Sequence, residues 1–296
     1  MRNVDDLISK ALSRRNFLLG AGSAATLTAV GCGGSTFQPQ TTPDNPPVTF
    51  TDNDYLNFAL NLEYLEASYY LMAATGSGLP SADAGSGAGS LTGGAQVTFT
   101  SQIQQEYTYE LAQNELTHVR YLRNALGSAA VSAPAIDLVN SFNAAAMAAG
   151  IGSSFNPFAS FDNFLVGAFV FEDVGVTAYA GAAPLLSAKT YYGPLIGIQG
   201  SEAYHAGEIR TLILQAGSTY VDYANKISAT RASLGGGNET MLSATSVAAA
   251  DSTNAIGFSR TPNQVLQIVY LSPNGNLPSG GFFPNGMNGN IKVTTA

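Results

Sequence analysis

The stretch that decides the fold is Gly200-Ser201-Glu202-Ala203-Tyr204-His205-Ala206-Gly207-Glu208-Ile209-Arg210. Its core is Glu-x-x-His, and residues three apart share one face of a helix, so Glu202 and His205 are expected side by side. The same pattern recurs as Glu115-x-x-His118, again with an Arg eight residues after the Glu. The chain of 296 residues contains only these two histidines. Two such copies on strongly helical segments, together using every histidine, predict a metal site.

Each Glu-x-x-His segment follows a helical segment that carries a Glu within an apolar stripe. Glu63 lies in segment 53–74 and Glu172 in segment 161–182. A carboxylate buried in such a stripe is costly unless it is paired or binds a metal. We therefore predict that both carboxylates are metal ligands.

Three more residues are expected close behind these ligands. Tyr70 and Tyr179 each follow one of the two isolated Glu residues at a spacing of seven. Glu66 lies one turn after Glu63. Either it supports the ligands from behind, or it is a half-exposed surface residue.

Four long helices are predicted, over residues 53–74, 100–126, 161–182 and 193–216. The predicted ligands fall near the middle of each helix, and in an antiparallel four-helix bundle such positions meet at one level. The converging set is Glu63, Glu115, His118, Glu172, Glu202 and His205. Carboxylates with two imidazoles suit iron or manganese better than zinc, so we expect two Fe or Mn ions per chain.

The third of these helices is unusually apolar. Between Asn163 and Ser187 its only charged residues are Glu172 and Asp173. Such a helix is either buried or spans a membrane. Two adjacent acids in the middle make a span costly, so we predict a buried helix.

The remaining segments complete an all-α fold. We place the four-helix bundle over 51–217 and an irregular C-terminal extension over 218–296. Residues 75–97 are expected to form a long surface loop, and the crossover 128–158 to contain a helical stretch at about 136–148. In the extension, 218–250 looks helical and then loose, and a short helix is expected near 265–270. The Gly-rich tail either closes over the bundle or contacts another subunit.

The N-terminus reads as a targeting segment, 1–31, followed by a flexible tether, 32–50. Ser13-Arg14-Arg15-Asn16-Phe17-Leu18 resembles a twin-arginine export signal, and the apolar run after it is too short to span a bilayer. The single cysteine, Cys32, follows Ala29-Val30-Gly31, as at a bacterial lipoprotein processing site. Either Cys32 is lipidated, or cleavage elsewhere discards it or leaves it free. We expect export to the periplasm or cell envelope, with membrane attachment only through such a lipid.

Charge excludes one class of partner. The whole chain has 12 basic and 20 acidic side chains, and removing the four and two within residues 1–31 leaves 8 and 18, a formal net charge of −10. A nucleic-acid-binding protein needs a basic surface, and the sequence shows no basic stripe. Nucleic acid is therefore not expected as a partner. The single cysteine also excludes a disulfide within the chain.

The chain resembles the ferritin-like superfamily through its Glu and Glu-x-x-His pattern, with Tyr70 after the first Glu. It resembles more narrowly the exported ferritin-like proteins of the desiccation-related type. That likeness rests on the phrases at 60–67 (LNLEYLEA), 202–210 (EAYHAGEIR) and 281–286 (GFFPNG). One departure is that Asn114 and Ser201 stand where di-iron relatives often place an Asp that holds a histidine.

The resemblance implies a dinuclear centre that cycles between divalent and trivalent metal and reduces O2 or peroxide. One alternative is a non-enzymatic stress-protective protein with a structural metal site. Another is a peroxide scavenger similar to manganese catalase. The loop at 75–97, the long tail and the tether are hard to fit into a hollow storage cage, so we predict a monomer or homodimer.

Overall fold

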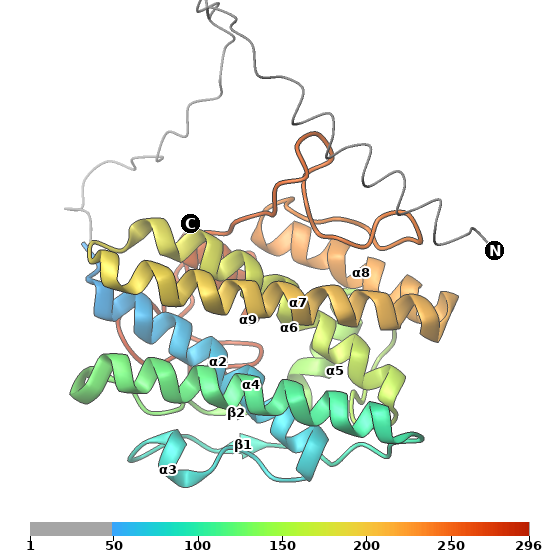
Figure 1. Ribbon diagram of the computed structural model, residues 1–296, viewed down its shortest axis with the longest axis horizontal. Helices are drawn as coiled ribbons and strands as arrows, with labels where there is room; N and C mark the ends of the chain where they lie inside the picture. Colours follow the sequence, from blue (N-terminus) through green and yellow to red (C-terminus); the bar gives the residue numbers. More distant parts are fainter. Residues whose placement is uncertain (1–48, 296) are drawn as a thin grey trace, which may run out of the picture. The chain divides into compact units, whose positions relative to one another are not determined.

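The computed structural model describes residues 49–295, and the expected signal, Cys32 and residues 32–48 of the tether lie outside this range. Four long helices dominate the described part: α2 (Asp52–Thr75), α4 (Gln102–Leu126), α6 (Phe161–Ala182) and α7 (Tyr192–Ala216) (Figure 1). α2 packs against α4, α6 packs against α7, and contacts between α2 and α6 join the two pairs. The prediction of an all-α ferritin-like bundle is confirmed.

Helix boundaries follow local capping chemistry. α2 begins after Thr51, whose side chain forms a capping box with Asp54, and ends at Gly76 in the left-handed region, with φ of 73°. Ser101 and Ser160 cap α4 and α6 by accepting hydrogen bonds from backbone N–H groups of the first turn. These signals explain why the predicted and observed boundaries of these three helices agree closely.

α6 is the buried helix of the bundle. With the turn after it (Phe161–Leu185), it is the one described helix long and apolar enough to cross a membrane. However, 83% of its most apolar window is buried inside the described part of the chain. Its apolar composition therefore reflects a core position, as predicted.

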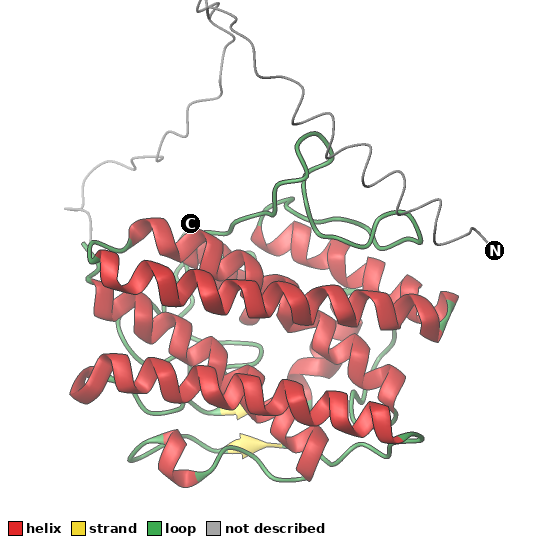
Figure 2. Ribbon diagram, viewed as in Figure 1, coloured by secondary structure: helices red, strands yellow, loops and turns green. Residues whose placement is uncertain are grey.

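The segment expected to be a plain surface loop, 75–97, contains two short elements (Figure 2). They are the helix α3 (Ser81–Ala84) and the strand β1 (Leu91–Thr92), which pairs in parallel with β2 (Ile136–Asp137). Asp83 also forms a bidentate ion pair with Arg120 of α4, at 2.8 and 2.9 Å. The segment is thus fixed to the bundle, which a lack of periodicity does not reveal.

The prediction of a helical stretch from about 136 is wrong at its start. Residues 136–137 form β2, and the helix α5 (Asn140–Ala148) begins only after a turn. The carboxylate of Asp137 accepts hydrogen bonds from the backbone N–H groups of Val139 and Asn140, each at 2.8 Å. Pairing with β1 and this turn together outweigh the local helical preference.

The C-terminal extension contains α8 (Ser218–Gly235), α9 (Pro262–Val269) and a tail that packs onto the bundle. The tail residue Phe282 is 1% exposed, and its ring centroid lies 5.1 Å from that of Phe142 and 4.9 Å from that of Phe171. Asn288 exchanges two hydrogen bonds with Asn61 of α2, at 2.8 and 2.9 Å. Of the two alternatives for the tail, the structure shows closure over the bundle.

Candidate metal centre

Side chains from all four long helices converge in the middle of the bundle. They form two overlapping groups, and within each group the donor atoms lie within 4.8 Å of one another: Glu63, Glu115, His118 and Glu202 in one, and Glu115, Glu172, Glu202 and His205 in the other. Glu115 and Glu202 belong to both groups. The structure therefore brings together all six residues that the sequence suggested as ligands.

Both imidazoles direct Nδ1 at the carboxylates. His118 Nδ1 lies 3.2 Å from Glu115, 3.3 Å from Glu63 and 3.5 Å from Glu202. His205 Nδ1 lies 2.9 Å from the other oxygen of Glu115 and 3.5 Å from Glu172. Glu115 thus lies between the two histidines, with one oxygen toward each, as a bridging ligand would.

Several of these donor atoms are buried and make no hydrogen bond of good geometry within residues 49–295, although all except Glu202 Oε2 lie within 3.5 Å of an oppositely charged group. They are Glu63 Oε2, Glu115 Oε1, Glu172 Oε2, both carboxylate oxygens of Glu202, and His205 Nδ1. Leaving a buried polar atom unpaired costs about 1–3 kcal/mol each, and more when the group is charged. Because these six atoms belong to one cluster, bound cations would satisfy them together. The residues present fit a dinuclear carboxylate centre.

The protonation states of the metal-free cluster are strongly perturbed. Burial raises the pKa of Glu63 to about 7, although the nearby His118 opposes the shift. Burial also raises the pKa of Glu202 well above its usual range, and the charges of Glu115 and Glu172 add to this rise. For His205, burial alone would lower the pKa. The nearby carboxylates of Glu172 and Glu115 outweigh this effect and raise the pKa to about 11. Without metal, the cluster therefore keeps protons that ions would displace.

Tyr70 and Tyr179 lie directly behind the ligands, as predicted. Tyr70 is fully buried and donates a hydrogen bond to Glu172, and Tyr179, 2% exposed, donates one to Glu63. Each tyrosine thus orients the isolated Glu of the other helix pair. Such partners fix the orientation of a ligand and tune its basicity.

Comparison with known proteins agrees with this geometry. Residues 51–215 match the family described as Ferritin-like domain. The chain belongs to the ferritin-like family. It is 28% identical to a protein named ferritin-like catalase Nec2 from Nesocodon mauritianus, over 86% of this chain and 88% of that protein. It is 29% identical to the desiccation-related protein PCC13-62 from Craterostigma plantagineum, over 73% of this chain and 76% of that protein.

Glu66 is an additional carboxylate in this ferritin-like centre. It is 4% exposed, so the interpretation as a half-exposed surface residue is wrong. Burial, followed by the charge of Glu202, raises its pKa well above the usual range, and its Oε2 makes no hydrogen bond within the described residues. Glu66 belongs to neither group of converging donor atoms. It therefore lies beside the candidate ligands, in surroundings that favour its protonated form.

Sequence reasoning missed the role of Gly175. A Cβ built at this position would lie 2.1 Å from Glu202 Oε2 and 3.3 Å from Glu66 Oε1. The absent side chain therefore leaves the space that both carboxylates occupy. The available signal was a glycine inside a helix, where it costs roughly 0.5–1 kcal/mol relative to Ala and so needs a packing reason.

Asn114, which stands where di-iron relatives often place an Asp, also contacts the centre. The Asn114 amide lies 3.2 Å from Nε2 of His205, on the opposite Glu-x-x-His helix. Asn114 thus contacts the histidine that the Asp of di-iron relatives was expected to hold. Ser201 does not make the equivalent contact with His118 on the opposite helix. Its Oγ lies instead 3.5 Å from Nε2 of His205, on its own helix.

A buried ion-pair network next to the centre was not predicted. Asp173, the neighbour of Glu172, pairs with Arg210 at 2.8 Å and with Arg231 at 2.7 Å. Arg231 also pairs with Glu239 at 2.8 Å. The repeated Glu-x7-Arg spacing indicated Arg210, but Arg231 and Glu239 come from the extension, where no sequence pattern linked them to the bundle. The network ties the extension to the helix that carries Glu172.

Proposed function

We propose that this chain is an exported ferritin-like protein that binds two iron or manganese ions and decomposes hydrogen peroxide. The observation that carries the proposal is the pair of overlapping donor groups sharing Glu115 and Glu202. Two sets of ligands with two members in common are what a dinuclear site requires. A single structural ion would leave one set of buried, unpaired donors unexplained.

In this proposal, Glu63 and His118 would hold one ion, Glu172 and His205 would hold the other, and Glu115 and Glu202, which belong to both groups, would contribute to both. Redox-active ions held there would supply the two-electron chemistry that turns one H2O2 into two waters and a second H2O2 into O2. The first half-reaction takes up two protons and the second releases two, so 2 H2O2 gives 2 H2O and O2. Carboxylate and imidazole ligands suit both iron and manganese.

The residues of the chain position ligands, handle protons and admit the substrate. Tyr70 and Tyr179 keep Glu172 and Glu63 oriented through their hydrogen bonds. Glu66 lies buried beside Glu202, in surroundings that raise its pKa, which suits it to exchange protons during the reaction. A cavity of about 220 Å³, lined by Asn114, Ser201 and His205 among others, reaches the centre and exceeds what a molecule slightly larger than water needs.

The comparisons support this choice of reaction. The similar protein from Nesocodon mauritianus is named a catalase, and the likeness extends over most of both chains. O2 is the alternative oxidant for such a centre.

The twin-arginine-like sequence and Cys32 support export and a lipid anchor at the periplasm or cell envelope. We also keep the proposal that the protein is a monomer or homodimer.

A second function is a stress-protective protein whose metal only stabilises the bundle. The similarity to a desiccation-related protein favours it, because that name describes a circumstance and not a reaction. The unpaired donors of the cluster also favour it, since metal binding would stabilise the fold even without turnover.

One experiment separates the two functions. The mature chain is loaded with Mn(II) or Fe(II), its metal content is measured by elemental analysis, and O2 evolution is recorded after adding H2O2. The proposed function predicts two ions per chain and one O2 for every two H2O2 consumed. Two bound ions without O2 evolution would favour the stress-protective function instead.

A further inference from the structure

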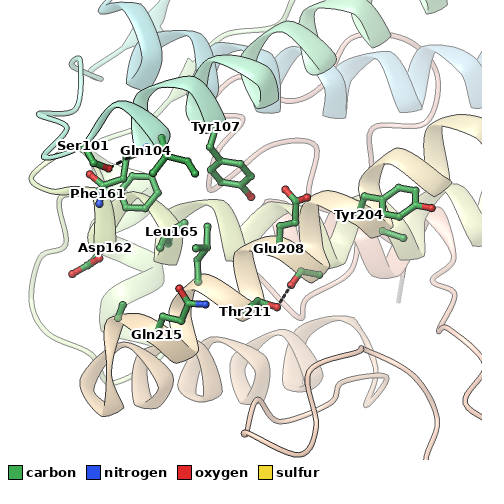
Figure 3. A pocket seen from close by; sticks show the side chains of 15 residues that line it. Ser101, Gln104, Tyr107, Phe161, Asp162, Leu165, Tyr204, Glu208, Thr211 and Gln215 are labelled. Atoms are coloured by element: carbon green, nitrogen blue, oxygen red, sulfur yellow. Dashed lines mark hydrogen bonds between the residues drawn. The ribbon is translucent and has the colours of Figure 1, made fainter. Parts of the chain in front are cut away.

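A large open groove runs along the outer side of the bundle, between the N-terminal half of α4, the start of α6 and the C-terminal half of α7. Its volume is about 910 Å³, within the range of small-molecule sites. Its floor contains Phe161 and Leu165, and Tyr107 and Glu208 point toward each other across it (Figure 3). The groove has the size and mixed lining of a site for an organic ligand.

The groove adjoins the cavity that reaches the metal centre. Tyr107, Tyr204 and Glu208 line both the groove and the 220 Å³ cavity that contains His205. These three side chains therefore form the boundary between the two spaces. A ligand in the groove would therefore lie next to the cavity that reaches the centre.

The hydroxyl of Tyr107 needs a partner. Its oxygen is buried and makes no hydrogen bond of good geometry within residues 49–295, although the carboxylate of Glu208 faces it. A buried hydroxyl without a partner is unfavourable. Because it borders the groove, a ligand there can supply the missing hydrogen bond.

The lining also restricts the charge of the ligand. It includes the carboxylates of Asp162 and Glu208 and no Lys, Arg or His. An anionic ligand would meet only like charges, since the whole chain carries a formal charge of −8. Aromatic rings and amide side chains such as Gln104 and Gln215 suit a flat, neutral molecule with hydroxyl groups.

We propose that this groove binds a small neutral dihydric phenol of the hydroquinone type, which reduces peroxide at the metal centre. The inference rests on the proposed peroxide chemistry and adds a second substrate to it. Both O–H bonds of the hydroquinone break, and two electrons and two protons pass to H2O2, whose O–O bond breaks. The products are one quinone and two waters. The groove thus adds a peroxidase activity to a centre that otherwise disproportionates peroxide.

The test compares two glycines of α7. At both Gly207, which lines the groove, and Gly197, which does not, an added Cβ meets no atom within 4 Å. Gly207→Leu should fill the groove without disturbing the bundle, and Gly197→Leu is its matched control. Binding of hydroquinone to the metal-loaded chain, measured by calorimetry without peroxide, should weaken about tenfold or more in Gly207→Leu and stay unchanged in Gly197→Leu.

Turnover is then followed with both substrates. In the unaltered protein, hydroquinone should lower the O2 yield and form one quinone per peroxide diverted. Gly207→Leu should still evolve O2 from peroxide alone but lose quinone formation. Tyr107→Phe should weaken hydroquinone binding, measured without peroxide, because it removes the hydroxyl that the ligand would bond.

Two related ligands check the chemistry assigned to the groove. 4-Hydroxybenzoate, with the same ring and a negative charge, should bind more weakly than hydroquinone. Tyramine binding more tightly than hydroquinone would overturn the assignment of a neutral ligand. O2 evolution without hydroquinone binding would overturn the groove proposal and leave the proposed function intact. Hydroquinone bound in the groove with neither O2 nor quinone formed would overturn the peroxide chemistry itself.

Discussion

The hydroxyl of Tyr70 on α2 donates a hydrogen bond to Glu172 on α6. The reciprocal bond runs from Tyr179 on α6 to Glu63 on α2. Each helix therefore carries one candidate ligand and the tyrosine that bonds the candidate ligand of the other helix. This crosswise arrangement makes the two halves of the centre depend on each other.

Removing either hydroxyl should impair the centre to a similar degree. In Tyr70→Phe, the carboxylate of Glu172 loses a buried donor, and metal affinity should fall roughly ten- to hundred-fold. Tyr179→Phe should act similarly through Glu63. Titration with Mn(II) would measure both effects, with Tyr109→Phe, at a side chain 52% exposed, as the control. Unchanged affinity in both variants would show that these bonds do not support the ligands.

Substituting a ligand shared by both donor groups should reduce the metal content more than substituting an unshared one. Glu115→Gln should reduce the metal content from two ions to well below one per chain, because Glu115 belongs to both donor groups. Glu63→Gln should leave about one ion, since the group around His205 stays complete. Elemental analysis measures this, and Glu106→Gln, on the exposed face of the same helix, should retain both ions. Equal losses in the first two variants would argue against bridging by Glu115.

The metal-free protein should be less stable at neutral pH than at mildly acidic pH. The folded-state pKa of Glu63 is raised to about 7, so the folded chain keeps a proton there that the unfolded chain loses near pH 4.5. Stability from this group is therefore complete below about pH 4.5 and lost as pH rises through 7, by about 1.4 kcal/mol per pH unit for each such proton. Glu66, Glu172 and Glu202 shift in the same direction.

Thermal unfolding from pH 5 to pH 8, with and without metal, checks this prediction. The metal-loaded protein should melt higher at neutral pH, because cations replace the protons. The difference in melting temperature between the metal-free and metal-loaded protein should become smaller toward pH 5. Identical melting curves at pH 7 would indicate that the site does not bind metal.

Adding one methyl group at Gly175 should disturb the centre. In Gly175→Ala the new Cβ would lie 2.1 Å from Glu202 Oε2, so the carboxylate must move. We expect metal affinity to fall roughly tenfold or more. Gly197→Ala, where a Cβ meets nothing within 4 Å, should instead stabilise α7 by up to about 1 kcal/mol. Metal titration and thermal unfolding of both variants would test this contrast.

Breaking the buried ion-pair network should unfold the extension from the bundle. Arg231→Met leaves Asp173 and Glu239 buried with fewer partners, and removing one member of such a pair costs about 3–5 kcal/mol. Lys226→Met on the same helix breaks an exposed pair with Asp222 and should cost less than about 1 kcal/mol. Urea denaturation of both variants measures the difference, and similar costs would show that burial of the network does not matter.

Local patterns were sufficient to predict the donor set and the four helices that carry it. Glu115 and His118, like Glu202 and His205, are three residues apart, so helical geometry alone places each pair on one face. Capping residues and apolar periodicity likewise depend on neighbours within a few positions. A mid-helix location on each of four helices was then enough to predict where they meet.

Tertiary packing decided the features that depend on residues far apart in the sequence. The burial of Glu66, the space at Gly175 and the pairing of Tyr70 with Glu172, 102 residues away, arise only when α2, α6 and α7 come together. Ile136 joins a strand and not a helix because it pairs with Leu91. The sequence by itself determined which side chains can bind a metal, since that depends on residue type and helical period. The assembled bundle determined which carboxylates are buried and what supports them, because burial and hydrogen bonding are properties of surfaces that separate segments create together.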